Sequence, residues 1–219
     1  EGVDVSELTT IEQFNCLKNK LKTEFVIVRA GRSNGFVDNN ATKNIKNARE
    51  AGINDVDIYI FPCVKPKVLQ IIYDKYTITS VLNTLKSNNA NFGRVWLDIE
   101  GEVNDDYYFD EYYKWYLNKT KNIKFIDEMI NTLEEKNQLY GIYTNKNYWH
   151  KITGNIQKYN NNNIPIWYAH YDHKNNFNDY YNEGYSFGNW KHPTIKQYDD
   201  EKSEKSKVCG VSADYNWKP

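Results

Sequence analysis

The sequence predicts an α/β protein built as a single irregular (β/α) barrel of the TIM type, with helices missing from its C-terminal part. Eight short strands are expected along the 219 residues, and the earlier ones are mostly apolar runs separated by helices. This pattern is typical of parallel strands covered by helices. An ordinary barrel of this kind has ~250 residues, so this one is small. No segment has the composition of a linker, and we therefore expect one catalytic domain over residues 1–219.

Strands and helices alternate through the first part of the chain. Apolar runs predict strands over residues 2–6, 25–30, 57–63, 94–100 and 139–143. Helical spacing of apolar residues predicts helices over residues 9–22, 41–51, 78–86 and 122–136. Thr10 with Gln13 resembles a capping box at the start of the first helix. Gly52 follows the second helix in the position expected of a C-terminal cap.

The rest of the chain contains three further predicted strands and little convincing helix. The strands cover residues 164–171, 194–198 and 208–214. A run of asparagine at residues 160–163 is interpreted as a surface loop. The shortage of helices between these strands indicates an irregular version of the barrel.

Charge and composition exclude several classes of function. The chain has 28 Lys and Arg against 29 Asp and Glu, a net charge of −1, which gives no electrostatic footprint for nucleic acid or an anionic membrane. No apolar run approaches the ~20 residues that a membrane-spanning helix needs. The chain is rich in aromatic residues, with 19 Tyr, 6 Trp and 9 Phe, and these side chains suit sugar binding as well as core packing.

The three cysteines, Cys16, Cys63 and Cys209, lie far apart and form no CxxC pair. A zinc site or a thioredoxin-type motif is therefore not indicated. At most one intramolecular disulfide can form. Because the first and last elements of a closed barrel are neighbours, Cys16–Cys209 is the preferred pairing, although the sequence alone does not fix it.

A pair of acidic residues marks the end of the fourth predicted strand. Asp98 and Glu100 alternate with Val95, Leu97 and Ile99, so the acids share one face, roughly 6.6 Å apart along the strand. Two carboxylates this close cannot both ionise freely in a poorly solvated site, so one pKa should rise. A raised acid beside a charged carboxylate is the arrangement that glycoside hydrolysis needs. The alternative is a strand end with solvated acids.

Two further acids are expected at the same mouth of the barrel. Asp4 alternates with two valines in the first strand, and Asp214 ends the last predicted strand. These strands are neighbours in a closed barrel, and parallel barrels build active sites at the C-terminal ends of their strands. We therefore expect Asp4 and Asp214 to meet Asp98 and Glu100, which favours a catalytic site.

Other residues near strand ends are candidates for sugar binding. Trp167 and Tyr171 share one strand face and either line a sugar groove or fill the barrel. Asp172 just beyond them either accepts sugar hydroxyls or is exposed. Arg29 and Phe61 are weaker candidates for the lining of the cleft.

Two more features carry alternatives. The aromatic stretch at residues 107–116 follows Glu100 and either forms a wall of the cleft or, as the favoured interpretation, a helix packed against the barrel. His170 and His173 are too few and badly spaced for a zinc site, so neither a metal nor another cofactor is predicted.

A series of short motifs extends over essentially the whole chain. It comprises Gly2-Val-Asp-Val-Ser6, Phe25-Val-Ile-Val-Arg-Ala30, Ala51-Gly52, Ile60-Phe-Pro-Cys63, Trp96-Leu-Asp-Ile-Glu-Gly101, Gly141-Ile-Tyr-Thr144, Ile166-Trp-Tyr-Ala169, Gln197-Tyr198, Cys209-Gly210 and Asp214-Tyr-Asn216. Each motif is weak alone. In this order they resemble the glycoside hydrolase family 25 lysozymes, especially the eukaryotic secreted branch.

The resemblance implies hydrolysis of the β-1,4 bond between N-acetylmuramic acid and N-acetylglucosamine in peptidoglycan. Glu100 matches the family's proton donor, and Asp98 matches the acid beside it. Asp4 and Asp214 match the other two acids, which we expect to form hydrogen bonds, tune charge and position the sugar. Tyr143 matches a tyrosine that contacts the acetamido group or the developing charge, with core packing as the alternative.

Two mechanisms remain open at this point. Asp98 can orient the substrate's own 2-acetamido group as the nucleophile, which gives retention and is slightly favoured by the similarity to other D-x-E glycosidases. Alternatively, the acids activate a water molecule, which gives inversion. The resemblance further implies action on peptidoglycan polysaccharide in a secreted, lysosomal or phagosomal compartment. No partner chain is implied, so we expect a monomer. Asn40 and Asn118 begin sequons that could carry glycans there.

Rival functions come from other classes. A chitinase-like glycosidase shares the D-x-E pattern, and it would hydrolyse chitin oligomers but not peptidoglycan. In a non-catalytic sugar-binding barrel, Glu100→Gln would leave both bacterial wall binding and any turnover unchanged. A structural or interaction protein would leave four acids at one mouth unexplained.

Overall fold

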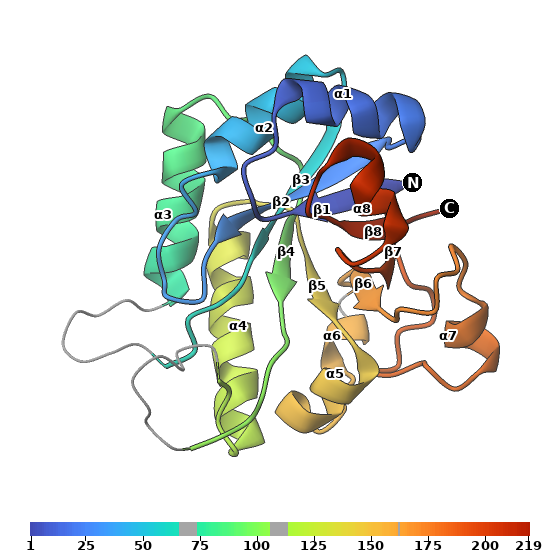
Figure 1. Cartoon of the computed structure of the whole chain (residues 1–219). Coiled ribbons are helices and arrows are strands. Elements are labelled where there is room, and N and C mark those ends of the chain that lie inside the picture. Colours follow the sequence, from blue (N-terminus) through green and yellow to red (C-terminus); the bar gives the residue numbers. More distant parts are fainter. Residues whose placement is uncertain (66–73, 106–113, 162) are drawn as a thin grey trace.

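The computed structural model describes residues 1–65, 74–105, 114–161 and 163–219. In this part of the chain, eight strands form a closed barrel in sequence order (Figure 1). The strands are β1 Gly2–Val5, β2 Phe25–Gly31, β3 Asp55–Ile60, β4 Val95–Asp98, β5 Tyr140–Thr144, β6 Ile166–Ala169, β7 Ile195–Asp199 and β8 Asp214–Trp217. The predicted fold class is therefore confirmed.

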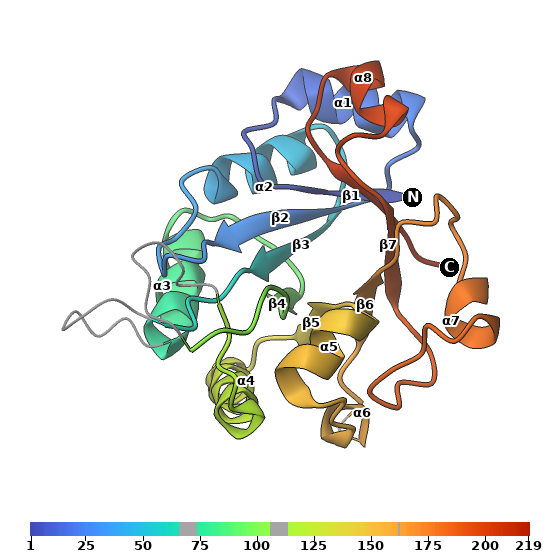
Figure 2. The same ribbon diagram turned by 60° about the horizontal axis from the view of Figure 1, so that its bottom comes forward.

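The helices of the first half are long, and those of the second half are short. The long helices are α1 Ile11–Lys20, α2 Ala41–Glu50, α3 Asp74–Ser87 and α4 Lys119–Glu135, and they lie outside the barrel (Figure 2). The later helices are α5 Lys146–Thr153, α6 Lys158–Asn161, α7 Asn178–Asn182 and α8 Glu204–Cys209. The segments between the last strands thus do contain helices, but these are shorter than the helices of the first half.

The last strand differs from the prediction in position and direction. Residues 208–214 alternate like a strand, but residues 204–209 form α8, which ends at Gly210 with φ of +60°. The strand β8 begins only at Asp214 and pairs antiparallel with both β1 and β7. The prediction of an all-parallel barrel is therefore wrong for this strand. Because β8 runs antiparallel to its neighbours, its first residue, Asp214, lies at the mouth of the barrel where the other three acids lie.

Apolar side chains form two separate layers of core. Outward residues of the strands, such as Val26, Val28 and Leu97, pack against the helices. The inside of the barrel is filled mainly by large side chains, namely Phe25, Ile27, Trp96, Tyr143, Trp167 and Ile195. The barrel is thus a packed core, and open space is confined to its mouth.

The ends of helices follow their local sequence signals. In the predicted capping box, the Gln13 backbone N–H donates to Thr10 Oγ1, and the Thr10 N–H donates to Gln13 Oε1. Gly52 follows α2 with a φ of +81°, a conformation in which a side chain would be strained.

A disulfide joins the first helix to the last one. Cys16 of α1 and Cys209 of α8 are bonded, with their Cα atoms 5.7 Å apart, which confirms the preferred pairing. The two helices lie side by side in both ribbon views (Figure 2). Cys63 is buried with its thiol outside any disulfide. Among the described helices, none is both long enough and apolar enough to cross a membrane.

Candidate active site

Four carboxylates surround one small cavity at the mouth of the barrel. The cavity has a volume of about 60 Å³ and is lined by Asp4, Tyr59, Asp98, Glu100, Tyr143, Trp167, Gln197 and Asp214. All four acids that the sequence singled out are therefore brought together. They come from strands far apart in the chain, and the closure of β1 against β8 completes the ring.

The strand β4 places Asp98 and Glu100 as the alternation predicted. Val95 and Leu97 face the outer core, whereas Trp96 points into the barrel and Asp98 ends the strand above it. Glu100 lies two residues further on, where Gly101 turns the chain with φ of +110°. The Trp115 indole N–H donates to the Glu100 backbone carbonyl at 2.8 Å, so the main chain that carries Glu100 is anchored by a buried ring.

Asp4 and Asp214 lie directly opposite each other on antiparallel strands. Like charges in this arrangement are destabilising. Here amide donors offset the repulsion, because Asp4 Oδ2 accepts from Asn216 Nδ2 at 2.7 Å and from Gln197 Nε2 at 2.8 Å. Gln197 Nε2 also lies 3.2 Å from Asp214 Oδ2, and the Glu201 backbone N–H donates to Asp214 Oδ1 at 2.8 Å.

Burial and nearby negative charge raise the pKa of every acid in the cluster. For Glu100, burial and the charge of Asp214 raise the pKa from 4.5 to about 7. For Asp214, burial and the neighbouring charge of Glu201 raise the pKa to about 6. Burial raises the pKa of Asp4 and of Asp98 well above the usual range, and nearby carboxylates raise both further. The cluster therefore holds protons near neutral pH, and Glu100 can act as an acid there.

Asp98 carries a carboxylate oxygen that no described residue satisfies. Its Oδ1 is buried without a hydrogen-bond partner in the described part of the chain. A buried polar atom left in this state is costly. It lines the acid cavity, so a bound ligand with an N–H or O–H donor would satisfy it.

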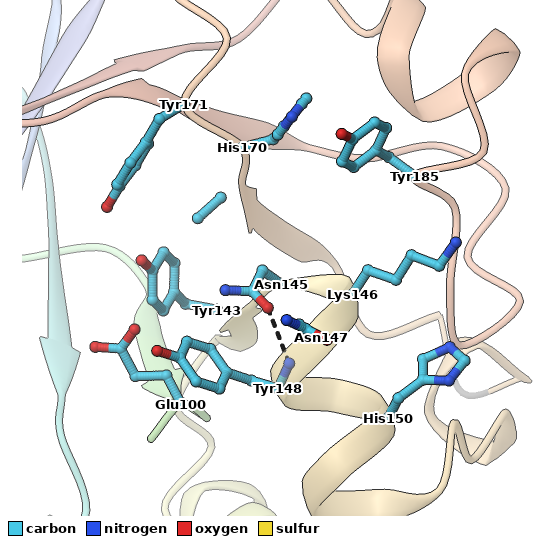
Figure 3. A pocket seen from close by; sticks show the side chains of 11 residues that line it. Glu100, Tyr143, Asn145, Lys146, Asn147, Tyr148, His150, His170, Tyr171 and Tyr185 are labelled. Carbon is cyan, nitrogen blue, oxygen red and sulfur yellow. Dashed lines mark hydrogen bonds between the residues drawn. The ribbon is translucent and has the colours of Figure 1, made fainter. Parts of the chain in front are cut away.

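A larger pocket opens beside the acid cavity (Figure 3). It has a volume of about 550 Å³ and is lined by Glu100, Tyr143, Asn145, Lys146, Asn147, Tyr148, His150, Ala169, His170, Tyr171 and Tyr185. Glu100 and Tyr143 line both spaces, so the two are adjacent at the proton-holding group. Tyrosine rings and amide side chains make this pocket suitable for sugar rings and their N-acetyl groups.

The structure separates the predicted sugar-binding residues into two groups. Tyr143 and Tyr171 line the larger pocket, and Trp167 lines the acid cavity while also filling the barrel at 4.4 Å from the Tyr143 ring. Three others line neither space. Arg29 pairs with Asp38 at 2.7 Å, Asp172 accepts from Lys196 at 2.8 Å, and Phe61 follows the end of β3. Most of the aromatic stretch 107–116 lies outside the described residues.

Comparisons with known proteins decide the family. The chain matches the family model described as lysozyme-like protein 1 over residues 1–198. It is 37% identical to the probable GH family 25 lysozyme 2 of Dictyostelium discoideum over 218 residues, which is 100% of this chain and 90% of that protein. The chain belongs to the glycoside hydrolase family 25 lysozymes. The resemblance that the motifs indicated is thereby confirmed.

Solved structures of a muramidase and an endolysin show the same fold. The muramidase of Acremonium alcalophilum matches with a TM-score of 0.68 at 20% identity, covering 100% of this chain and 92% of that one. The modular Cpl-1 endolysin, solved with a tetrasaccharide-pentapeptide peptidoglycan analogue, matches with a TM-score of 0.53 at 13% identity. This match covers 98% of our chain and 54% of the endolysin.

Several residues at the site of this family 25 protein were not predicted from the sequence to be functional. Tyr59 and Gln197 line the acid cavity, and Trp115 and Asn216 support it from behind. Tyr59 could have been predicted, because it shares a strand face with the candidate Phe61, two residues earlier in the same predicted strand. Gln197 and Asn216 stand in the motifs that carry the family resemblance, and Trp115 stands in the aromatic stretch 107–116. Nothing in their spacing assigned any of the three a role at the site.

A second polar cluster lies behind the large pocket of this lysozyme-family barrel. His170, Asp172 and Asp179 offer three possible metal ligands within 4.8 Å of one another. The Lys196 ammonium already lies between the two carboxylates, 2.8 Å from Asp172 and 3.0 Å from Asp179. Lys196 therefore supplies the positive charge that a metal ion would bring, and we interpret the cluster as a buried ion network.

Proposed function

We propose that this chain is an N-acetylmuramidase, a lysozyme that hydrolyses the β-1,4 bond between N-acetylmuramic acid and N-acetylglucosamine in peptidoglycan. The observation that carries the proposal is the convergence of Asp4, Asp98, Glu100 and Asp214 on one cavity beside a larger pocket. Family membership and the relatives named as muramidases and lysozymes support the substrate class. We further propose that residues 1–219 act as one catalytic domain.

Glu100 is the proton donor in this mechanism. Its pKa of about 7 keeps the side chain largely protonated in mildly acidic solution. Glu100 lines both the acid cavity and the larger pocket, so it would lie beside a glycosidic bond between one sugar in each of them. It donates a proton to the glycosidic oxygen as the bond breaks and the sugar ring gains oxocarbenium character.

Asp98 is the assisting acid. Its buried Oδ1, which has no hydrogen-bond partner among the described residues, favours a mechanism in which the substrate's own 2-acetamido group is the nucleophile. The N–H of that group would supply a partner and would orient the acetamido oxygen toward the anomeric carbon. This donor would also stabilise the carboxylate form, whose pKa burial holds high in the free protein. The proposal is therefore hydrolysis with retention. Asp4 and Asp214 tune charge and position the sugar.

Product analysis tests the proposed bond and substrate. Purified bacterial wall should lose turbidity when the protein is added, and the new reducing ends should be N-acetylmuramic acid. New reducing ends of N-acetylglucosamine would assign the opposite bond preference. Cleavage of chitin oligomers without cleavage of wall would instead favour the chitinase-like alternative. Absence of hydrolysis together with retained wall binding would point to a sugar-binding barrel.

Activity should fall as the pH rises through about 7. Glu100 must be protonated to act, and burial with the charge of Asp214 raises its pKa to about 7. The profile of kcat/KM against pH reports this group in the free enzyme. Asp214→Asn removes the charge that raises the pKa of Glu100, so its alkaline limb should move to lower pH. A wild-type profile that stays flat to pH 9 would contradict the assignment of Glu100.

The compartment is a further part of the proposal. A disulfide between Cys16 and Cys209 is typical of extracellular or luminal proteins. We propose secretion or delivery to a lysosomal or phagosomal vesicle, where the mildly acidic medium would keep Glu100 protonated.

A further inference from the structure

We propose that Gln197 is a positioning residue of the active site. Its side-chain amide sets the hydrogen-bonding direction of Tyr143 and Tyr171, and it holds Asp4 and Asp214 in one arrangement. This inference rests on the function proposed above, because it concerns how the same site meets its substrate.

Every hydrogen-bonding position of the Gln197 amide is occupied. Its Nε2 donates to Asp4 Oδ2 at 2.8 Å and to Asp214 Oδ2 at 3.2 Å. Its Oε1 accepts from the Tyr143 hydroxyl at 2.7 Å and from the Tyr171 hydroxyl at 2.9 Å. The side chain is only 2% exposed. An amide has two donor hydrogens and two acceptor lone pairs, so all four are used.

The two carboxylates fix which way the amide points. While Asp4 and Asp214 are ionised, the reverse orientation would set the amide oxygen against their carboxylate oxygens, and repulsion would replace two hydrogen bonds. The acids therefore hold the Gln197 oxygen toward Tyr143 and Tyr171. The acids orient the amide, and the amide in turn orients the tyrosine hydroxyls.

Each tyrosine has a single hydroxyl hydrogen, and we place both hydrogens on Gln197 Oε1 rather than in the contact between the Tyr143 and Tyr171 hydroxyls. The hydroxyl oxygens of Tyr143 and Tyr171 are consequently left as acceptors toward the cavities. In Figure 3, both hydroxyls lie on the same side as the Glu100 carboxylate. Acceptors there suit the N–H and O–H groups of an amino sugar and the positive charge of an oxocarbenium-like ring.

The same bonds keep the proton of Glu100 in place. A tyrosine released from Gln197 could donate to the Glu100 carboxylate, which would favour its charged form and lower its pKa. Several titratable groups face Gln197 or its direct partners. They are Asp4, Tyr59, Asp98, Glu100, Tyr143, Tyr171 and Asp214, with Arg29 beside Tyr59 and with Asp199, Asp200 and Glu201 beside Asp214. The amide is thus an uncharged group in contact with several titratable side chains. Its replacement should change the pKa values of the acids around it.

Two substitutions at this position should shift the pH profile in opposite directions. Gln197→Glu keeps the acceptor for the tyrosines but adds a negative charge, so the alkaline limb of kcat/KM should move to higher pH by about one unit. Gln197→Met removes the acceptor and the donors. The freed tyrosines and a more readily neutralised Asp214 should both lower the pKa of Glu100, moving that limb to lower pH. Gln157→Glu adds the same charge at an exposed site and should leave the profile unchanged.

A measurement without turnover separates this inference from the proposed function. The carboxyl carbons of Asp4 and Asp214 can be titrated by ¹³C NMR, and both pKa values should rise in either Gln197 variant because the amide donors are lost. Wild-type protein that fails to hydrolyse wall would refute the proposed function, whereas the NMR titration still decides the role of Gln197. Unchanged carboxyl titrations would overturn the inference, as would pH profiles that both variants share with the wild type. If one variant does not fold, the other decides alone.

Discussion

Glu100→Gln should lower the rate of wall hydrolysis by about 10²–10⁴-fold, the usual contribution of a general acid. Glutamine has nearly the same shape as glutamate but has no carboxylic proton to donate, so the sugar contacts of the pocket should survive. Turbidity loss of purified wall measures the rate, and co-sedimentation with wall measures binding. We expect binding within a few-fold of the wild type. Hydrolysis at close to the wild-type rate would move the proton donor to another residue.

Glu102→Gln is the matched control for this substitution. Glu102 lies two residues further along the chain, is exposed, and forms a 3.5 Å ion pair with Lys151. An exposed pair of this kind contributes about 0–1 kcal/mol to stability. The same chemical change at this position should therefore leave both the rate and the fold intact.

Glu100→Gln should also change how stability depends on pH. Burial raises the pKa of Glu100 from 4.5 to about 7, so the folded protein holds this proton more tightly than the unfolded chain does. The stabilising contribution of Glu100 is present below pH 4.5 and is lost as the pH rises through 7. The variant should thus unfold at a higher temperature than the wild type at pH 8, and the difference should shrink toward pH 4.5. A lower melting temperature at pH 8 would instead show that the substitution disturbs the fold.

The central part of the site could be predicted from sequence because strand geometry is regular. In β4, Val95 and Leu97 must face the helices, so Asp98 points to the opposite face of the strand. Glu100, two residues later, was expected on that same face. Barrel closure then placed Asp4 beside the last strand. The position of Asp214 was predicted for the wrong reason, because the strand that carries it starts there and runs antiparallel.

The supporting residues could not be predicted, because their roles depend on contacts across the barrel. Gln197 meets Asp4 over a separation of 193 residues, and Asn216 meets it over 212 residues. A single amide in a strand has no partner visible in the local pattern. Lys196 is a stronger case, since a lysine on a strand is normally taken as solvated, yet its side chain is fully buried.

The substitution Lys196→Met should destabilise the fold by about 3–5 kcal/mol, the usual cost of removing one partner from a buried ion pair. Lys196 lies on the outer face of β7, and its ammonium contacts Asp172 at 2.8 Å and Asp179 at 3.0 Å. Methionine fills a similar volume but leaves both carboxylates without this charge. His170, at 2.6 Å from Asp179, would then be the nearest remaining compensation.

Equilibrium unfolding in urea measures this effect against two comparison variants. Lys207→Met removes the charge of an exposed pair with Glu204 and should change the free energy of unfolding by no more than about 1 kcal/mol. Adding Asp179→Asn to Lys196→Met should recover part of the lost stability, because one of the two uncompensated charges disappears. A loss of less than 1 kcal/mol in Lys196→Met would mean that the Lys196 charge is not needed to keep Asp172 and Asp179 buried. The buried lysine would then be dispensable to the wall of the large pocket, which His170 lines.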